Sequence, residues 1–416
     1  MNAVILSIGD ELVLGQTIDT NSAWLSAQLA AIGCDVLAHI TIPDSQALTE
    51  QAIRRNVPHC DVLLISGGLG PTEDDLTRQA MAGAMGVELV LCEAWVPKLE
   101  AFFRLRNRPM PASNRIQAML PQGARTIDNT CGTACGIAAR MASCDIYVMP
   151  GVPREMKIMF ARDVLPQLAA RSAGRIILSR TLHTFGLGES SVGVLLGDLM
   201  DRRRNPSVGT TVSAGLVSIR INARFDSLAQ AQDQLAQTEA ACRQRLADLI
   251  YGTDGATLPQ AIAPLLVSHS KTIATAESCT GGLLAAMFTE VPGSSRYFRQ
   301  GWVTYSNQSK EQLLGVCPGT LLAHGAVSEP TVREMAQAAR RLAGADFALS
   351  ISGIAGPDGG TAEKPVGTVC FGFAHPDGTS TYTLPMLGER DMIRDRACKT
   401  AMTILRYHLI EKPLPF

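Results

Sequence analysis

The sequence predicts an α/β protein built from several domains. Its 416 residues exceed what one hydrophobic core usually supports. Short apolar runs alternate with longer amphipathic stretches at both ends of the chain, and this pattern is interrupted near 171–254. We therefore expect α/β domains at 1–170 and 255–416, with a smaller α+β domain between them at 171–254.

The first segment has the pattern of βαβ units. "AVILSIG" precedes a helical stretch through "NSAWLSAQLAAIG". "DVLAHITIPD" precedes one near 45–57, and "DVLLISGG" precedes one near 75–86. This order predicts a parallel sheet, in which ligands bind beyond the carboxyl ends of the strands.

The middle segment reads as two strands, "GRIILSRTLHTFG" and "GLVSIRINARFD", with helices near 189–201 and 227–249. "YGTDGATLP" has the turn residues of a linker. In the last segment we expect strands at "KTIATA", "GWVTYS", "DFALSIS", "PVGTVCFGFAHP" and "STYTLPML", with helices near 257–269, after "TAESCTGG", and at 308–315, 328–343 and 389–411.

Composition indicates a folded cytoplasmic protein. Hydrophobic residues make up 46% of the chain and charged residues 18%, with a net charge of −1 and no lysine- or arginine-rich block. A nucleic-acid partner is therefore disfavoured. The N-terminus lacks the pattern of a signal peptide, and no apolar run is long enough for a membrane helix. The 11 scattered cysteines indicate reduced thiols in the cytoplasm.

Polar loops follow two strands of the first domain. In "SGGLGPTEDDLT", Gly67, Gly68 and Gly70 let backbone N–H groups approach an anion. The nearby carboxylates of Asp74, Asp75 and Glu11 would repel a bare phosphate unless a divalent cation of the magnesium type bridged them. Asn21, from the polar loop in "GDELVLGQTIDTN", lies near this group in the motif. The alternative is structural, because aspartate is also a favoured helix cap.

"TAESCTGG" places Ser278 on a strand-to-helix turn of the last domain. Thr280, Gly281 and Gly282 would supply N–H groups for an oxyanion or a phosphate. The stretch lacks both Gly-x-Ser-x-Gly and the Gly-Lys-[Ser/Thr] of a P-loop. Taken alone, Ser278 is equally well explained as a helix cap.

Other residues of this domain shift the balance toward catalysis. Lys310 and Tyr305 could manage the proton of a nucleophilic serine, although a solvated lysine and an ordinary strand tyrosine are the alternatives. "SISGIAGPDGG" adds Ser352 and Gly353, and Arg390 is suited to a fork-like grip on phosphate. Together these residues indicate hydrolysis of an amide on a phosphorylated substrate.

The motifs "GDELVLGQTIDTN", "SGGLGPTEDDLT" and "PGVPREM" resemble the molybdopterin-binding-like αβα domain that opens the CinA (competence/damage-inducible) family. The resemblance implies a metal-dependent ADP-ribose pyrophosphatase, with Asp74 and Asp75 as metal ligands and Glu11 and Asn21 nearby. The family usually has a proline where Cys135 stands in "GTACG", so we expect a looser loop there.

The middle segment is similar to the KH-like module of the same family. It has "FGLGES" but no basic Gly-x-x-Gly loop of the kind that clamps a nucleic-acid backbone. A structural or dimer-forming role is therefore expected, and the family implies a homodimer.

"TAESCTGG", "GSSRYFRQGWVTYSNQSK", "SGIAGPDGG" and "GERD" resemble the CinA C-terminal domain and stand-alone nicotinamide mononucleotide deamidases of the PncC type. The resemblance implies conversion of nicotinamide mononucleotide and water to nicotinic acid mononucleotide and ammonia, without a cofactor. A serine would attack, Lys310 with Tyr305 would move the proton, and Arg390 would bind the phosphate. The nucleophile is open between Ser278 and Ser295. The competing hypothesis is a competence or DNA-uptake factor that binds nucleotides or protein without turnover.

Overall fold

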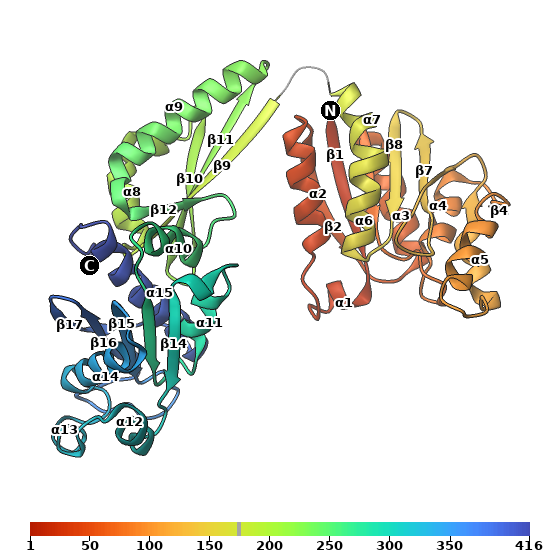
Figure 1. Cartoon of the computed structure of the whole chain (residues 1–416). Coiled ribbons are helices and arrows are strands. Elements are labelled where there is room, and N and C mark those ends of the chain that lie inside the picture. The colour runs from red at the N-terminus through yellow and green to blue at the C-terminus, as the bar shows by residue number, and fades with distance from the viewer. Residues whose placement is uncertain (173–175) are drawn as a thin grey trace. The chain divides into compact units, whose positions relative to one another are not determined.

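The computed structural model describes residues 1–172 and 176–416. They form two compact units, one of Met1–Leu178 with Ala223–Gln234 and one of Ser179–Asn222 with Leu235–Phe416 (Figure 1). Residues 174 and 175, the first two of the predicted strand 174–186, lie outside the described residues.

The N-terminal domain contains a six-stranded sheet in the order β2-β1-β3-β8-β7-β6. Its strands are β1 (Asn2–Ile8), β2 (Asp35–Ile42), β3 (Val62–Ser66), β6 (Arg125–Ile127), β7 (Gly136–Met141) and β8 (Cys144–Met149). The predicted parallel arrangement is confirmed for β2, β1 and β3, and β8 extends it, whereas β7 runs antiparallel to both of its neighbours, β8 and β6. A short β4 (Leu89–Leu91) pairs separately with β5 (Met119–Pro121).

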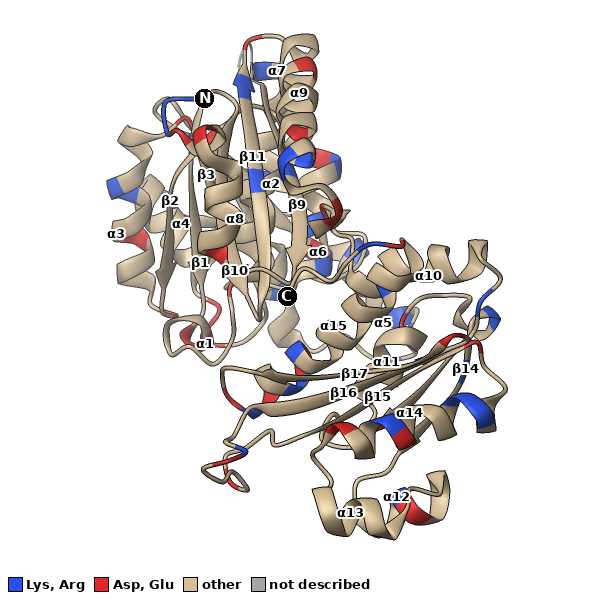
Figure 2. Cartoon of the chain, turned by 90° about the vertical axis from the view of Figure 1, so that its left-hand side faces the viewer, with Lys and Arg blue, Asp and Glu red and all other residues tan. Residues whose placement is uncertain are grey.

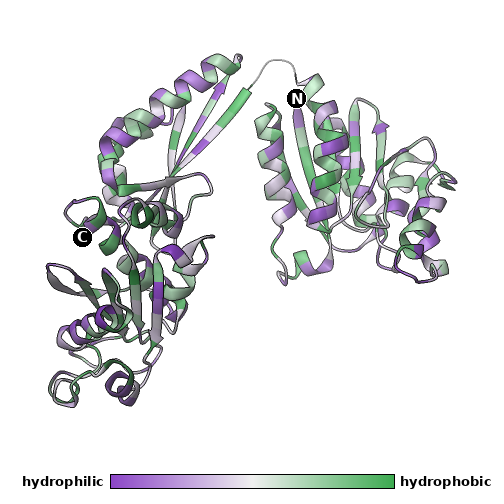
Figure 3. Cartoon of the chain, viewed as in Figure 1, coloured by the Kyte–Doolittle hydropathy of each residue, from purple (hydrophilic) through white to green (hydrophobic). Residues whose placement is uncertain are grey.

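Helices cover both faces of this sheet, because successive strand residues point to opposite sides. On β1, Val4 and Leu6 pack into one buried cluster, and Ala3 and Ile5 pack into another. Figure 3 shows the hydrophobic strands between helices that carry polar residues. The helices are α1 (Asp10–Val13), α2 (Thr20–Ala31), α3 (Gln46–Asn56), α4 (Thr77–Met85), α5 (Val96–Arg104), α6 (Pro153–Met159) and α7 (Leu165–Arg171).

The middle segment forms a four-stranded antiparallel sheet in the order β10-β11-β9-β12. Its elements are β9 (Ile176–Phe185), β10 (Ser207–Ser213), β11 (Leu216–Phe225), β12 (Ile250–Thr253), α8 (Glu189–Leu196) and α9 (Leu228–Leu246). The interpretation of 251–259 as a linker is wrong at its start, because residues 251–253 belong to β12. Buried Ile250 anchors β12 against β9 before the turn residues begin.

The C-terminal domain has a five-stranded sheet in the order β14-β13-β15-β16-β17, with β13 parallel to both neighbours. Its strands are β13 (Ile273–Glu277), β14 (Phe298–Val303), β15 (Phe347–Gly353), β16 (Thr368–His375) and β17 (Gly378–Pro385). Its helices are α10 (Leu258–Ser268), α11 (Leu283–Thr289), α12 (Asn307–Leu314), α13 (Pro318–His324), α14 (Glu329–Ala343) and α15 (Arg390–Leu409). Of these elements, α13 was not predicted.

The register of this sheet brings three strand ends together. Glu277 at the end of β13 pairs with Val303 of β14 and with Ile351 of β15. The residues that follow on each strand therefore share one edge, where a parallel sheet places its ligands.

Charge is mixed along the chain, in line with the net charge of −1. Helices α3, α9, α14 and α15 each carry both acidic and basic residues (Figure 2). Among the described residues, none of the helices combines the length and apolar character needed to cross a membrane.

Candidate active site

The turn after β13 holds Ser278 in place through its backbone. Its N–H donates to the carbonyl of Ile351 at 2.9 Å, and its side chain is buried, with 8% of the residue exposed. Gly281 and Gly282 have φ of +59° and +94°, the left-handed region that glycine enters without steric cost. The two glycines let the chain reverse from β13 into α11.

Glu277 is the fully buried residue that shapes this turn. Its carboxylate accepts N–H groups from Gly282 at 3.0 Å, Leu284 at 3.1 Å and Ala285 at 2.8 Å. It therefore satisfies the first turn of α11, whose N–H groups have no partner within the helix. Sequence reasoning missed this role, and the only signal was a carboxylate at the end of an apolar strand.

The predicted substrate-binding N–H groups of Gly281 and Gly282 already have protein acceptors. Gly281 donates to the carbonyl of Ser278 at 3.1 Å, and Gly282 donates to Glu277. Within the described residues, the backbone N–H groups of Cys279 and Thr280 have no acceptor. These two N–H groups, directly after Ser278, are the unpaired backbone donors of the described turn.

Lys310 reaches Ser278 from α12. Its Nζ lies 3.1 Å from the Oγ of Ser278 and donates to the carbonyl of Thr304 at 2.9 Å. The side chain is fully buried, and burial lowers the pKa of Lys310 below its ordinary 10.5. In the described part of the chain, no carboxylate forms an ion pair with this amine. Burial therefore makes this amine easier to deprotonate than that of a solvated lysine, and once neutral its lone pair could accept the serine proton.

Tyr305 and Arg390 form a second group at the same edge. The Nη2 of Arg390 donates to the hydroxyl of Tyr305 at 3.1 Å, and its Nη1 donates to the carbonyl of Gly356 at 2.7 Å. Tyr305 is 61% exposed, and its hydroxyl bonds to Arg390 instead of to Lys310. Arg394, which sequence reasoning did not select, donates from Nη2 to the carbonyl of Thr280 at 3.0 Å.

Two other predicted residues have structural partners. Ser352 is buried, and its hydroxyl donates to the carbonyl of Ala326 at 2.7 Å. A side chain at Gly353 would lie 2.9 Å from the Cγ2 of Val369, so glycine is needed there for packing. Both residues support the edge at which Ser278 lies.

Ser295 lies far from Lys310 along the sheet. It is an exposed residue in a single turn of 3₁₀ helix, Ser294–Arg296, just before β14. The first residue of β14, Phe298, pairs with the first residue of β13, whereas Ser278 follows the last. The 5 residues of β13 separate the two serines by about 17 Å at roughly 3.3 Å per residue.

The N-terminal domain has its own cavity of about 450 Å³ beyond the ends of β1, β3 and β8. Gly67, Gly68 and Gly70 line it, and the first two have φ of +113° and +65°. Buried Arg78 donates to the carbonyls of Leu69 and Gly70 in this loop. The guanidinium group of Arg78 thus fixes the backbone of the glycine loop, a role that sequence reasoning missed.

Five carboxylates line the same cavity, contributed by Glu11, Asp44, Asp74, Asp75 and Glu155. Asp75 accepts the N–H groups of Gly70 at 2.6 Å and Thr72 at 2.9 Å, so it braces the loop, whereas Asp74 is exposed. Burial, with the negative charges of Asp10, Glu11 and Asp74, raises the pKa of Asp44.

The predicted metal ligands share this cavity without forming a compact ligand group. Across residues 1–172 and 176–416, no three histidine, cysteine or carboxylate side chains converge closely enough to hold an ion. Asn21 lines an adjoining hollow with Glu11, and its amide donates to the carbonyl of Gly151 at 2.7 Å. Its Oδ1 is buried without a hydrogen-bond partner.

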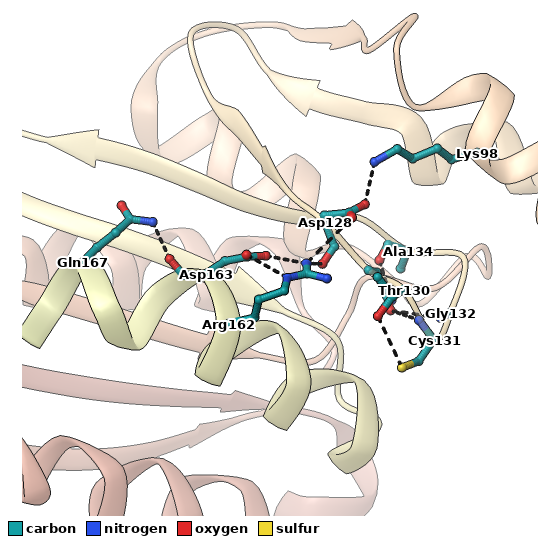
Figure 4. Close-up of polar contacts among 10 residues, drawn as sticks. Lys98, Asp128, Thr130, Cys131, Gly132, Ala134, Arg162, Asp163 and Gln167 are labelled. Atoms are coloured by element: carbon teal, nitrogen blue, oxygen red, sulfur yellow. Dashed lines mark hydrogen bonds and ion pairs between the residues drawn. The ribbon is translucent and has the colours of Figure 1, made fainter.

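The expectation of a loose loop at "GTACG" is wrong. The side chain of Asn129 accepts the N–H groups of Cys131 at 3.0 Å and Gly132 at 2.9 Å, and donates to the carbonyl of Ala134 at 2.9 Å. Cys135 is fully buried. One residue before Asn129, Asp128 forms ion pairs with Lys98 and Arg162, as Figure 4 shows. Side-chain contacts therefore replace the stiffness of the missing proline.

Comparison with known proteins assigns each of the three segments to a family domain. A family profile described as the CinA C-terminal domain matches residues 255–409. A probable molybdopterin binding domain matches 4–170, and the damage-inducible protein CinA KH domain matches 179–252. A CinA-like protein of Geobacter sulfurreducens is 41% identical over 411 residues, covering 99% of this chain and 100% of that protein. The chain belongs to the CinA family.

A second relative agrees with this assignment. A CinA-like protein of Desulforapulum autotrophicum is 40% identical over 417 residues, covering 99% of both chains. Among solved structures, the competence/damage inducible protein CihA of Agrobacterium tumefaciens is 40% identical, with a TM-score of 0.36, covering 37% of this chain and 93% of that one. The three CinA domains follow one another in the predicted order.

Proposed function

We propose that the C-terminal domain hydrolyses the carboxamide of nicotinamide mononucleotide to nicotinic acid mononucleotide and ammonia. The observation that carries the proposal is the 3.1 Å contact between Lys310 Nζ and Ser278 Oγ. A buried lysine without a carboxylate partner is suited to act as a general base, because its amine is more readily neutral than that of a solvated lysine.

In the proposed reaction, the Oγ of Ser278 attacks the carboxamide carbon while Lys310 takes the hydroxyl proton. The carbonyl oxygen becomes an oxyanion, for which the N–H groups of Cys279 and Thr280 are the available donors. Lys310 then gives its proton to the departing nitrogen, and ammonia leaves an ester on Ser278. Water attacks the ester, its proton passes through Lys310, and Ser278 is released with the nicotinic acid nucleotide. This route uses only protein groups and water.

The full-length protein tests this function directly. Incubation with nicotinamide mononucleotide is expected to yield ammonia and nicotinic acid mononucleotide in equal amounts, at a rate unchanged by a metal chelator. Folded protein that releases no ammonia above the blank would favour the competing role, a nucleotide- or protein-binding factor in competence.

We further propose that the N-terminal domain is a metal-dependent ADP-ribose pyrophosphatase. Support comes from one cavity that combines a glycine loop with five carboxylates. Such oxygen-rich surroundings suit a divalent cation of the magnesium type, which would also offset the burial and the neighbouring negative charges that raise the pKa of Asp44. Glu11, Asp74 and Asp75 would supply its oxygen ligands, and because they do not converge in the described structure, binding would have to draw them together. When bound, the cation would neutralise phosphate charge.

Asp74→Asn is expected to lower magnesium-dependent release of AMP and ribose 5-phosphate from ADP-ribose by about 100-fold. The matched control is Glu73→Gln, an exposed neighbour that does not line the cavity. Equal rates for the two variants would remove Asp74 from the site. Ammonia release from nicotinamide mononucleotide serves as a check that the Asp74→Asn protein is otherwise intact.

A further inference from the structure

We infer that Arg390 and Arg394 together form a clamp for the 5′-phosphate of the nucleotide substrate, in which Arg394 is the second, newly assigned phosphate-binding residue. This inference rests on the proposed deamidase function, because it concerns the substrate of that site. It extends the earlier expectation for Arg390 alone.

The amino end of α11 is the obvious competing site for an anion. A phosphate could approach the amino end of α11, but Glu277 already occupies it with three N–H···O bonds of 2.8 to 3.1 Å. A phosphate there would have to displace a fully buried carboxylate or lie against it. The nucleotide phosphate must therefore be held by other groups at this edge of the sheet.

Two arginines of α15 supply positive charge at that edge. Arg390 and Arg394 are four residues apart on α15, so their side chains leave the same face of the helix. Arg390 bonds to Gly356 in the loop after β15, and Arg394 bonds to Thr280 in the turn that carries Ser278. One helix face thus presents two guanidinium groups to the two loops that border the site.

The guanidinium groups of Arg390 and Arg394 keep their positive charge available to a ligand. The bonds to Gly356 and Thr280 end on neutral carbonyl oxygens, which orient the guanidinium groups without cancelling their charge. Within the described residues, the only carboxylate paired with Arg394 is Asp391 at 3.5 Å, and its side chain is 94% exposed. The Nε of Arg394 is shielded from solvent and has no hydrogen-bond partner, a feature shared by Arg396, so the position of Arg394 beside the Ser278 turn is what distinguishes it.

An oriented guanidinium with an unused buried donor is incomplete without an anion. Exposed Arg390 and partly buried Arg394 can share the three oxygens of a phosphate monoester, which arginine binds through paired N–H···O bonds. The clamp would distinguish the nucleotide from the nucleoside, which has the same carboxamide but lacks the phosphate. Arg394 is thus a specificity-determining residue whose effect falls on nucleotide binding.

The test compares kcat/KM for nicotinamide mononucleotide and nicotinamide riboside in the full-length protein. Arg394→Gln is expected to lower the nucleotide-to-riboside ratio by about 30-fold, chiefly through KM for the nucleotide. Arg394→Lys should retain part of the ratio. Arg396→Gln is the matched control, since Arg396 lies on the same helix and also donates to a carbonyl, that of Leu387. It should keep the wild-type ratio.

Equal losses on both substrates in Arg394→Gln would overturn the clamp and assign Arg394 a structural role, as would an unchanged ratio. If wild-type protein releases no ammonia, the deamidase proposal fails, and calorimetric titration with nicotinamide mononucleotide then decides the clamp. Weaker binding in Arg394→Gln than in Arg396→Gln supports it, and equal binding overturns it.

Discussion

Lys310→Met is expected to lower kcat for ammonia release from nicotinamide mononucleotide by about 10⁴-fold, the scale seen when one member of a nucleophile–base pair is removed. Methionine keeps the length and apolar stem of the buried side chain but has no amine to take the proton of Ser278. The control is Lys399→Met, because Lys399 forms an ion pair with Asp395 on α15. Wild-type turnover in the Lys310 variant would exclude the dyad.

The same residue predicts the pH dependence of the reaction. The amine of Lys310 must be neutral to act as a base, so kcat/KM should rise as the pH increases and level off above its pKa. Because burial lowers this pKa, the midpoint of the rise is expected below 10.5. The pH–rate profile of the wild type checks this. The residual activity of Lys310→Met should lack that rise, and an identical rise in the variant would assign it to another group.

Motif chemistry identified Ser278 and Lys310 separately, but the sequence could not show that they touch. Their contact depends on the parallel pairing of β13 with β14, which brings the chain after β14 back to the turn after β13. Hydrophobic periodicity predicted both strands and the helix that carries Lys310. The parallel order follows from the βα alternation. The sequence therefore predicts that the two residues lie at the same edge of the sheet, but it does not predict the distance between their side chains.

Glu277 and Arg394 could not be predicted, for a physical reason. Each acts through backbone groups: Glu277 binds the N–H groups at the start of α11, and Arg394 binds the carbonyl of Thr280. A backbone N–H or carbonyl is present at almost every residue, so the residue type at the partner position does not reveal such a contact. The same reason explains why Asn129 was missed and why the loop at Cys135 was expected to be loose.

In the N-terminal domain, the glycine loop and Asp74 were recognisable because they follow a strand in a compact motif. Asp44 and Glu155 come from separate segments after β2 and β8, and only the assembled sheet brings them to the same cavity. The directions of β6 and β7 were likewise not readable, since apolar periodicity is the same in parallel and antiparallel strands.

The most direct test of the account measures ammonia release from nicotinamide mononucleotide by Ser278→Ala and Ser295→Ala in parallel with the wild type. Ser278→Ala is expected to lose about 10⁴-fold in kcat, because no other hydroxyl is bonded to Lys310 in the described chain. Ser295→Ala should turn over at the wild-type rate, since Ser295 lies at the opposite end of β13. Full activity in Ser278→Ala, or a loss confined to Ser295→Ala, would contradict the assignment of Ser278 as the nucleophile.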